Sequence, residues 1–416
     1  MISQQLKIQF QIILAILTTF ITLGIVLIAF FQYNENIDIE ELISFSIAIV
    51  LLGLHLLFVY QTIKHQRRAY SLTYGLVIGI SASLVSAIRN INPFLGIENH
   101  DTIGLQLSLI LWSLTFFMIY LFFEGLYTLQ TNSIRLSVIL IFLITTIITH
   151  TGHILAESIS TPNNSLSTTL DALWHWADFS YNGLGIIIFA FGIYVIYQSY
   201  KFVEREWNPI IQIIGLSMLI FGFVIGLMID FSFLINNIIG INPSDFIEPF
   251  IGDFGKIIGI IIFILSYLLE VDYLYRLPYP TPSIFFFQTQ SGLCLNVSHT
   301  KAVIGFHTTK QVEEDLITGT ISAISTLMKE ATGSEGILRI ISATDQSIVF
   351  ASSGIVTVAA ITTKPTKYLV YSLNLALKLF EDKFGKYLEE DSAIDLQKFS
   401  NVPEILNQAF PYLNFE

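Results

Sequence analysis

Residues 277–288 read LPYPTPSIFFFQ, and this short stretch separates two kinds of sequence. Its three prolines favour an extended linker, because proline fixes its own backbone angle and restricts the residue before it. Upstream, residues 1–276 make up two thirds of the chain but carry only ten of its 20 Lys and Arg residues. Downstream, residues 283–416 begin with an aromatic run typical of a buried strand. The sequence therefore predicts two domains, 1–276 and 283–416, joined by a linker at 277–282.

The first domain consists of long apolar runs. The whole chain is 53% hydrophobic and only 12% charged, whereas soluble proteins carry about 25% charged residues. A run of about 20 apolar residues can cross a membrane as a helix, because the helix satisfies its own backbone hydrogen bonds. Eight runs qualify, at 9–32, 42–63, 70–90, 104–127, 134–155, 178–199, 208–235 and 251–272. We therefore expect an all-α polytopic domain of eight transmembrane helices in the lipid bilayer, rather than buried helices of a soluble protein.

The positive residues indicate the orientation of these helices. With residue 1 inside the cell, eight of the ten Lys and Arg residues of the first domain fall on inner loops, as the positive-inside rule requires. These eight are Lys7, Lys64, Arg67, Arg68, Arg135, Lys201, Arg205 and Arg276. Because the number of spans is even, we expect both termini of this multi-pass cell-membrane protein to lie in the cytoplasm.

Several ionisable residues lie within or at the ends of the apolar runs, where charges are costly and often functional, among them His55 near the middle of the second run. Glu124 is near the inner end of the fourth run, and Asp230 is in the seventh. Arg89 ends the third run on the outer side, where it could pair with Asp230. We expect a structural or interfacial role for Glu124. Glycines four residues apart, such as Gly222 and Gly226, indicate close helix packing, either within the bundle or in a homodimer.

Histidines gather at the predicted outer ends of the fifth and sixth runs. His150 and His153 are three residues apart and share one helix face, and His175 lies near the start of the next run. Together with Glu157 and Asp178, they could form a zinc site or a pH-sensitive site. The alternatives are a site for an outer ligand and ordinary interfacial histidines, which lie where amphipathic rings usually lie.

The second domain combines strand and helix patterns. Strands are predicted at 283–288, 293–297, 337–341, 348–351 and 355–361. Thr308 and Gln311 match a capping box that begins a first helix, and later helices are predicted at 369–387 and 402–412. The order β-β-α-β-β-β-α-α predicts an α+β domain with a five-stranded antiparallel sheet. A PAS- or profilin-like domain is the alternative fold.

The stretch DLITGTISAIS at 315–325 resembles the first helix of archaeal longin-like proteins. The SGL at 291–293 and the FGKYL at 384–388 are similar to the same group. The resemblance implies a longin-like domain of the roadblock/longin superfamily. Such domains act as non-enzymatic platforms that self-associate or bind small Ras-like GTPases in membrane trafficking. The resemblance assigns the core and interaction helix to Leu316, Ile317, Gly319, Ile321 and Ile324.

Signature motifs of several enzyme classes are missing from the sequence. No GxxxxGK[ST], GxSxG, GxGxxG or HExxH motif occurs, so we expect neither an enzyme nor a bound cofactor. The net charge of −12 argues against nucleic-acid binding, and the single cysteine, Cys294, cannot close a disulfide within the chain. We therefore expect a membrane-anchored interaction or signalling platform. The first alternative is a transporter or receptor-like sensor with a regulatory cytoplasmic domain. The more remote one is an outer-face metal site, as in a metalloenzyme, built on His150, His153 and His175.

Overall fold

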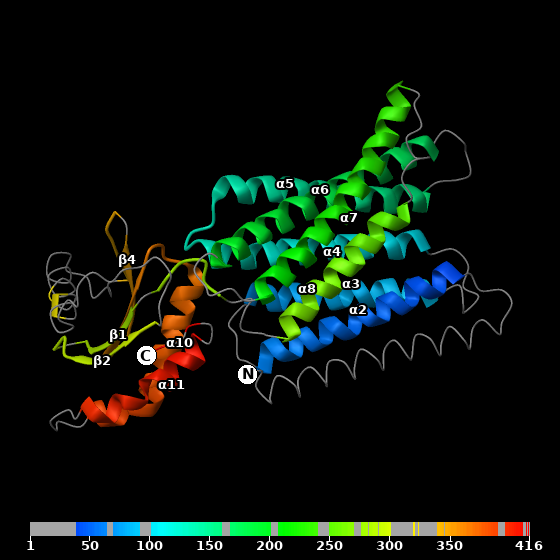
Figure 1. Cartoon of the computed structure of the whole chain (residues 1–416). Helices are drawn as coiled ribbons and strands as arrows, with labels where there is room; N and C mark the ends of the chain where they lie inside the picture. The colour runs from blue at the N-terminus through cyan, green and yellow to red at the C-terminus, as the bar shows by residue number, and fades with distance from the viewer. Residues whose placement is uncertain are drawn as a thin grey trace. The chain divides into compact units, whose positions relative to one another are not determined.

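The fold is given by a computed structural model of the whole chain (Figure 1). It describes residues 39–64, 70–91, 101–159, 167–200, 207–239, 249–269, 276–281, 283–289, 291–300, 339–344, 346–389 and 396–410, with residues 319, 320, 323, 413 and 415. The chain divides into two compact units. The first comprises Met1–Phe123, Asn132–Tyr194 and Trp207–Val271, and the second comprises Glu124–Thr131, Val195–Glu206 and Asp272–Glu416.

The first unit is built from helices in its described residues. Its helices are α2 (Ile39–Lys64), α3 (Tyr70–Ile91), α4 (Asp101–Tyr127), α5 (Ser133–Ile159), α6 (Ser167–Tyr200), α7 (Trp207–Ile239) and α8 (Pro249–Leu269), of which α4 and α6 each extend into the second unit. The second to eighth predicted runs each fall on one of these helices. The first predicted run, 9–32, lies outside the described residues.

Five described helices are long and apolar enough to cross a membrane. The apolar stretches are Tyr70–Arg89, Ile103–Tyr127, Ser133–Ala156, Leu173–Tyr200 and Pro209–Phe231. Shorter apolar stretches lie in α2 and α8, at Ile49–Tyr60 and Gly255–Leu268. Large apolar side chains such as Ile141 and Ile148 are exposed on α5, and lipid would cover such a surface. These helices indicate a multi-pass membrane protein, while the number of eight spans stays a prediction.

Helices α7 and α8 approach each other closely through glycines. A Cβ atom added to Gly222 would lie 2.5 Å from the Gly252 carbonyl oxygen and 2.6 Å from the Lys256 nitrogen. A Cβ atom added to Gly259 would lie 2.5 Å from the Leu219 nitrogen. Because only glycine lacks a Cβ atom, these positions permit a backbone contact that other residues would block. Gly222 and Gly259 therefore pack within the helical unit, which was one of the two predicted roles of the glycine pairs.

The second unit contains a five-stranded antiparallel sheet with the strand order β2-β1-β5-β4-β3. The strands are β1 (Ser283–Gln288), β2 (Cys294–His299), β3 (Ile340–Ser342), β4 (Ser347–Ser352) and β5 (Val356–Thr362). This confirms the antiparallel sheet, with strand bounds shifted by a few residues. Most of the predicted first helix lies outside the described residues, including Leu316, Ile317, Ile321 and Ile324. Gly319 is described as helical and exposed.

Strand β1 presents aromatic side chains to both faces of the sheet, because successive side chains alternate. On one face, the ring of Phe286 stacks on Phe380 of α10 (Lys367–Glu389) with centroids 4.7 Å apart. Phe380 stacks in turn on Phe399 of the 3-10 helix η4 (Leu396–Asn401), which precedes α11 (Val402–Ala409). On the other face, Phe285 and Phe287 belong to a buried apolar cluster with Phe350 and Ala359. Strand β1 is therefore buried on both faces.

Candidate functional site

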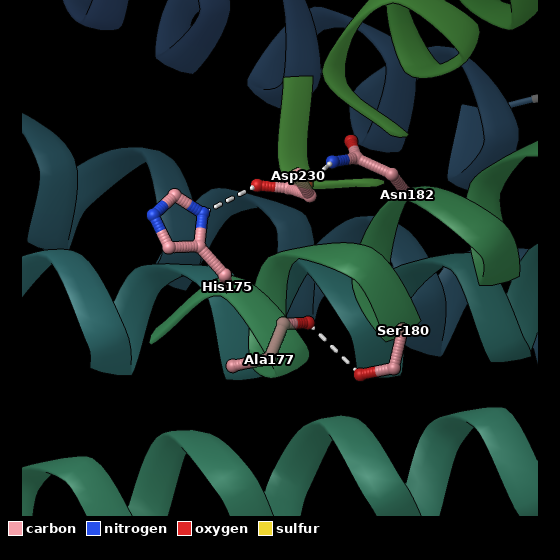
Figure 2. Close-up of polar contacts among 5 residues, drawn as sticks. All are labelled: His175, Ala177, Ser180, Asn182 and Asp230. Carbon is pink, nitrogen blue, oxygen red and sulfur yellow. Dashed lines mark hydrogen bonds and ion pairs between the residues drawn. The ribbon is translucent and has the colours of Figure 1, made fainter. Parts of the chain in front are cut away.

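A buried carboxylate links two helices of the first unit. Asp230 of α7 accepts a hydrogen bond from His175 Nδ1 at 3.1 Å and another from Asn182 Nδ2 at 3.0 Å, and both donors belong to α6 (Figure 2). Asp230 is 5% exposed and Asn182 is 3% exposed. Each oxygen of the carboxylate therefore has a donor, as a buried charged group requires.

Helical spacing positions these three side chains. His175 and Asn182 are seven residues apart, which is about two turns, so they lie on the same face of α6. Gly226 lies one turn before Asp230 on α7, and a Cβ atom there would lie 2.8 Å from Asn182 Nδ2. The missing side chain at Gly226 thus leaves the room that the Asn182 amide occupies.

Further charged side chains surround this network. Asp178 of α6 interacts electrostatically with Asp230, Lys256, His175 and Asp253. The Lys256 ammonium of α8 lies 3.2 Å from Asp253 Oδ1. It also lies 5.3 Å from the ring centre of Phe223 on α7, where the aromatic face attracts a cation. Acidic and basic groups from α6, α7 and α8 therefore meet in one region of the bundle.

Neighbouring polar contacts join α5 to α4 and α6. His150 Nδ1 and Gln106 Oε1 are hydrogen-bonded, and both residues are 0% exposed. Thr146 Oγ1, one turn earlier on α5, donates to Ser180 Oγ at 3.0 Å. His153 forms an edge contact with Trp174, with ring centroids 5.3 Å apart. We define the polar cluster as Gln106, His150, His153, His175, Asn182 and Asp230.

The predicted metal ligands His150, His153 and His175 do not gather into a ligand set. Within the described residues, no group of three or more His, Cys, Asp or Glu side chains is arranged to hold a metal ion. The physical reason is that the imidazoles turn to different partners: Gln106, Trp174 and Asp230, respectively. The Glu157 side chain lies outside the described residues. Metal analysis of the purified protein remains the direct check of that hypothesis.

The other predicted polar residues have separate surroundings. Glu124 is 1% exposed, and its Oε1 accepts a hydrogen bond from Thr128 Oγ1 at 3.2 Å within the second unit. The Arg89 side chain lies beside Gly104, where an added Cβ atom would be 3.2 Å from Arg89 Cβ. The hydrogen bonds described for Asp230 come from His175 and Asn182. They do not include the predicted pairing of Asp230 with Arg89.

Sequence reasoning did not single out Gln106 or Asn182. Both are neutral amides inside runs of apolar residues, where an ionisable side chain is the stronger indication of function. An amide inside a membrane-spanning helix also needs a hydrogen-bonding partner. Gln and Asn are rare in these apolar runs, and this rarity could have marked Gln106 and Asn182 as candidate residues. Their partners, Asp230 and His150, were singled out as ionisable residues, but the sequence does not indicate which residues on different helices pair.

Comparisons with known proteins give no match: no protein-family model, no curated protein and no solved structure matches this chain.

Proposed function

We propose that this chain is a membrane-anchored, non-enzymatic signalling platform whose helical unit acts as a sensor. The observation that carries the proposal is the Asp230 network with His175 and Asn182. It lies in helices α6 and α7, both of which have stretches long and apolar enough to cross a membrane. Ionisable groups at such positions are costly and are usually retained for a function.

The proposal assigns the output to the C-terminal part of the second unit. A sheet of five antiparallel strands with α10 against one face is the kind of domain that the longin-like resemblance implies. Such a domain recruits a small Ras-like GTPase or a second copy of itself. Strand β3 lies at one end of the sheet order and is only three residues long. An edge strand is one place at which sheet domains add a partner strand.

Partner capture by the full-length chain in lipid nanodiscs tests this function. The tagged protein is incubated with lysate of the native cell and either GDP or a GTP analogue, and bound proteins are identified by mass spectrometry. In parallel, mass photometry of the detergent-solubilised chain measures self-association. We expect nucleotide-dependent capture of a Ras-like GTPase or formation of a dimer.

A matched pair of variants separates specific capture from background. Phe380→Ala removes a fully buried ring beneath the sheet and should abolish capture, while Leu396→Ala, at a side chain that is 50% exposed, should preserve it. If the intact chain neither captures a GTPase nor self-associates, the platform function is excluded.

Transport is a second candidate function, favoured by a specific observation. Asp178, Asp230 and Lys256 place acidic and basic groups on three neighbouring helices, and such groups mark ion or proton pathways in membrane proteins. Proton or cation flux is measured in liposomes that contain the reconstituted protein. Flux with the unmodified protein, but not with Asp230→Asn, would favour a transporter over a sensor.

A further inference from the structure

The pair Gln106 and His150 has hydrogen-bonding capacity that its described neighbours do not use. The two side chains bond to each other between α4 and α5, and both are 0% exposed. Gln106 Nε2 and His150 Nε2 are buried and have no hydrogen-bond partner among the residues that the structure describes. Buried polar atoms nearly always have a partner in proteins, so these two neighbouring atoms call for an occupant that can hydrogen-bond to both of them.

The chemistry of the two unpartnered atoms does not depend on how the amide and the ring are assigned. As placed, the Gln106 oxygen can only accept, so His150 Nδ1 carries the proton and His150 Nε2 is an acceptor, while Gln106 Nε2 is a donor. With the amide flipped, the Gln106 nitrogen donates to His150 Nδ1. The proton then resides on Nε2, and the Gln106 oxygen becomes the free acceptor. In both cases a neutral pair offers at least one donor and at least one acceptor.

The pair lies close to one end of α4. Gln106 is the sixth residue of α4, which at 1.5 Å per residue places it about 8 Å from the start of that helix. On α5, polar side chains continue along the same face at Thr146 and His153. Both unpartnered atoms lie inside stretches apolar enough to span a membrane, where a neutral ligand is favoured over an ion.

We propose that Gln106 and His150 bind a small neutral molecule carrying both a hydrogen-bond donor and an acceptor, such as a primary amide. This inference rests on the sensor function proposed above and names the class of ligand that the sensor detects. The amide N–H donates to the free acceptor of the pair, and the amide oxygen accepts from the free donor. The same chemistry is available from a dissolved molecule and from a lipid with an amide head group.

Two matched probes test the inference on the intact protein. Propionamide carries a donor and an acceptor, whereas butanone has nearly the same shape but replaces the amino group by a methyl group and can only accept. Binding of each probe to the full-length chain in nanodiscs is measured by saturation-transfer difference NMR. Loss of one hydrogen bond worth about 1.4 kcal/mol is a tenfold change in affinity, so propionamide should bind about ten times more tightly than butanone.

Two variants locate the site. Gln106→Leu should weaken propionamide binding at least about tenfold by the same conversion. Gln212→Leu is the matched control, because Gln212 is also buried, at 2% exposure, and its Nε2 likewise lacks a described partner, but it lies near the start of α7. The control variant should bind propionamide as the unmodified protein does. Because the two probes are compared on the unmodified protein, the test stands even if Gln106→Leu does not fold.

The outcomes are distinct. Tighter binding of propionamide than of butanone, lost in Gln106→Leu and kept in Gln212→Leu, supports the site. Equal binding of the two probes, unchanged binding in a folded Gln106→Leu, or no binding of propionamide overturns it and leaves water as the occupant. Displacement of propionamide by octadecanamide added to the nanodisc identifies a lipid source, and no displacement identifies a dissolved one. Partner capture is measured without any probe, so failure of the platform function is distinguishable from failure of this site.

Discussion

The side-chain amide of Asn182 on α6 donates a hydrogen bond to Asp230 Oδ2 on α7 at 3.0 Å, and the two residues are 48 positions apart in the sequence. His175 donates to the other oxygen of the same carboxylate. A carboxylate held in this way fixes the rotation of α6 relative to α7, because two donors separated by two turns must both reach it. The polar contact thus serves the packing of the bundle as well as any sensing function.

Replacing Asp230 by alanine is expected to destabilise the helical unit. The change removes the acceptor of two hydrogen bonds and leaves the Asn182 amide without that partner, at a cost of about 1–3 kcal/mol. Thermal unfolding of the detergent-solubilised protein measures the loss. Asp253→Ala is the control, because the Asp253 side chain is 71% exposed and should change stability little. Equal losses in the two variants would contradict a structural role of the network.

The glycine contact between α7 and α8 predicts a second stability difference. Gly222→Ala places a methyl group 2.5 Å from a backbone oxygen of α8 and should cost about 1–3 kcal/mol through overpacking. Gly152→Ala, on α5, is the matched control, because nothing lies within 4 Å of its added Cβ atom. It should be neutral or slightly stabilising, since alanine favours helix more than glycine does. The unfolding curves of the two variants are recorded in the same detergent. If the two curves coincided, the close approach of α7 and α8 would be refuted.

The stacked rings of Phe286, Phe380 and Phe399 predict where the second unit is most sensitive. Phe380→Ala deletes a ring that is 0% exposed and should destabilise the sheet and its helices by about 3–5 kcal/mol. Limited proteolysis should then cleave the C-terminal region while the membrane helices stay protected. Leu396→Ala should leave the cleavage pattern unchanged, and an intact pattern in Phe380→Ala would show that the stack is dispensable.

Chemical labelling checks the predicted orientation. The only cysteine, Cys294, is buried, so Cys294→Ser gives a background that lacks thiols. In that background, Ser291→Cys in the hairpin turn should react with a membrane-impermeant maleimide only after the cells are opened. Ser165→Cys, on a loop predicted to face outward, should react on intact cells. The reverse pattern would place the C-terminal domain outside and overturn the positive-inside assignment.

The sequence by itself determined the existence and type of most elements. A run such as 70–90 is apolar over a membrane's thickness, and α3 spans Tyr70–Ile91. The aromatic run at 283–288 predicted a strand, and β1 occupies the same six residues. Length, apolar content and side-chain period act along the chain, so they can be read without knowing its neighbours. The 3-10 helix η4 was not predicted, since short 3-10 turns have no strong sequence period.

Only the tertiary structure decided which polar side chains meet. The sequence grouped His150, His153 and His175 as a possible zinc site, pH-sensitive site or outer-ligand site, or as ordinary interfacial histidines. The structure pairs His150 with Gln106, 44 residues away, and His175 with Asp230, 55 residues away. Such pairs depend on which helices are neighbours and on how each helix is rotated about its axis. Those two quantities are set by packing across the whole bundle, including the glycine contacts of α7 and α8, and a one-dimensional pattern does not contain them.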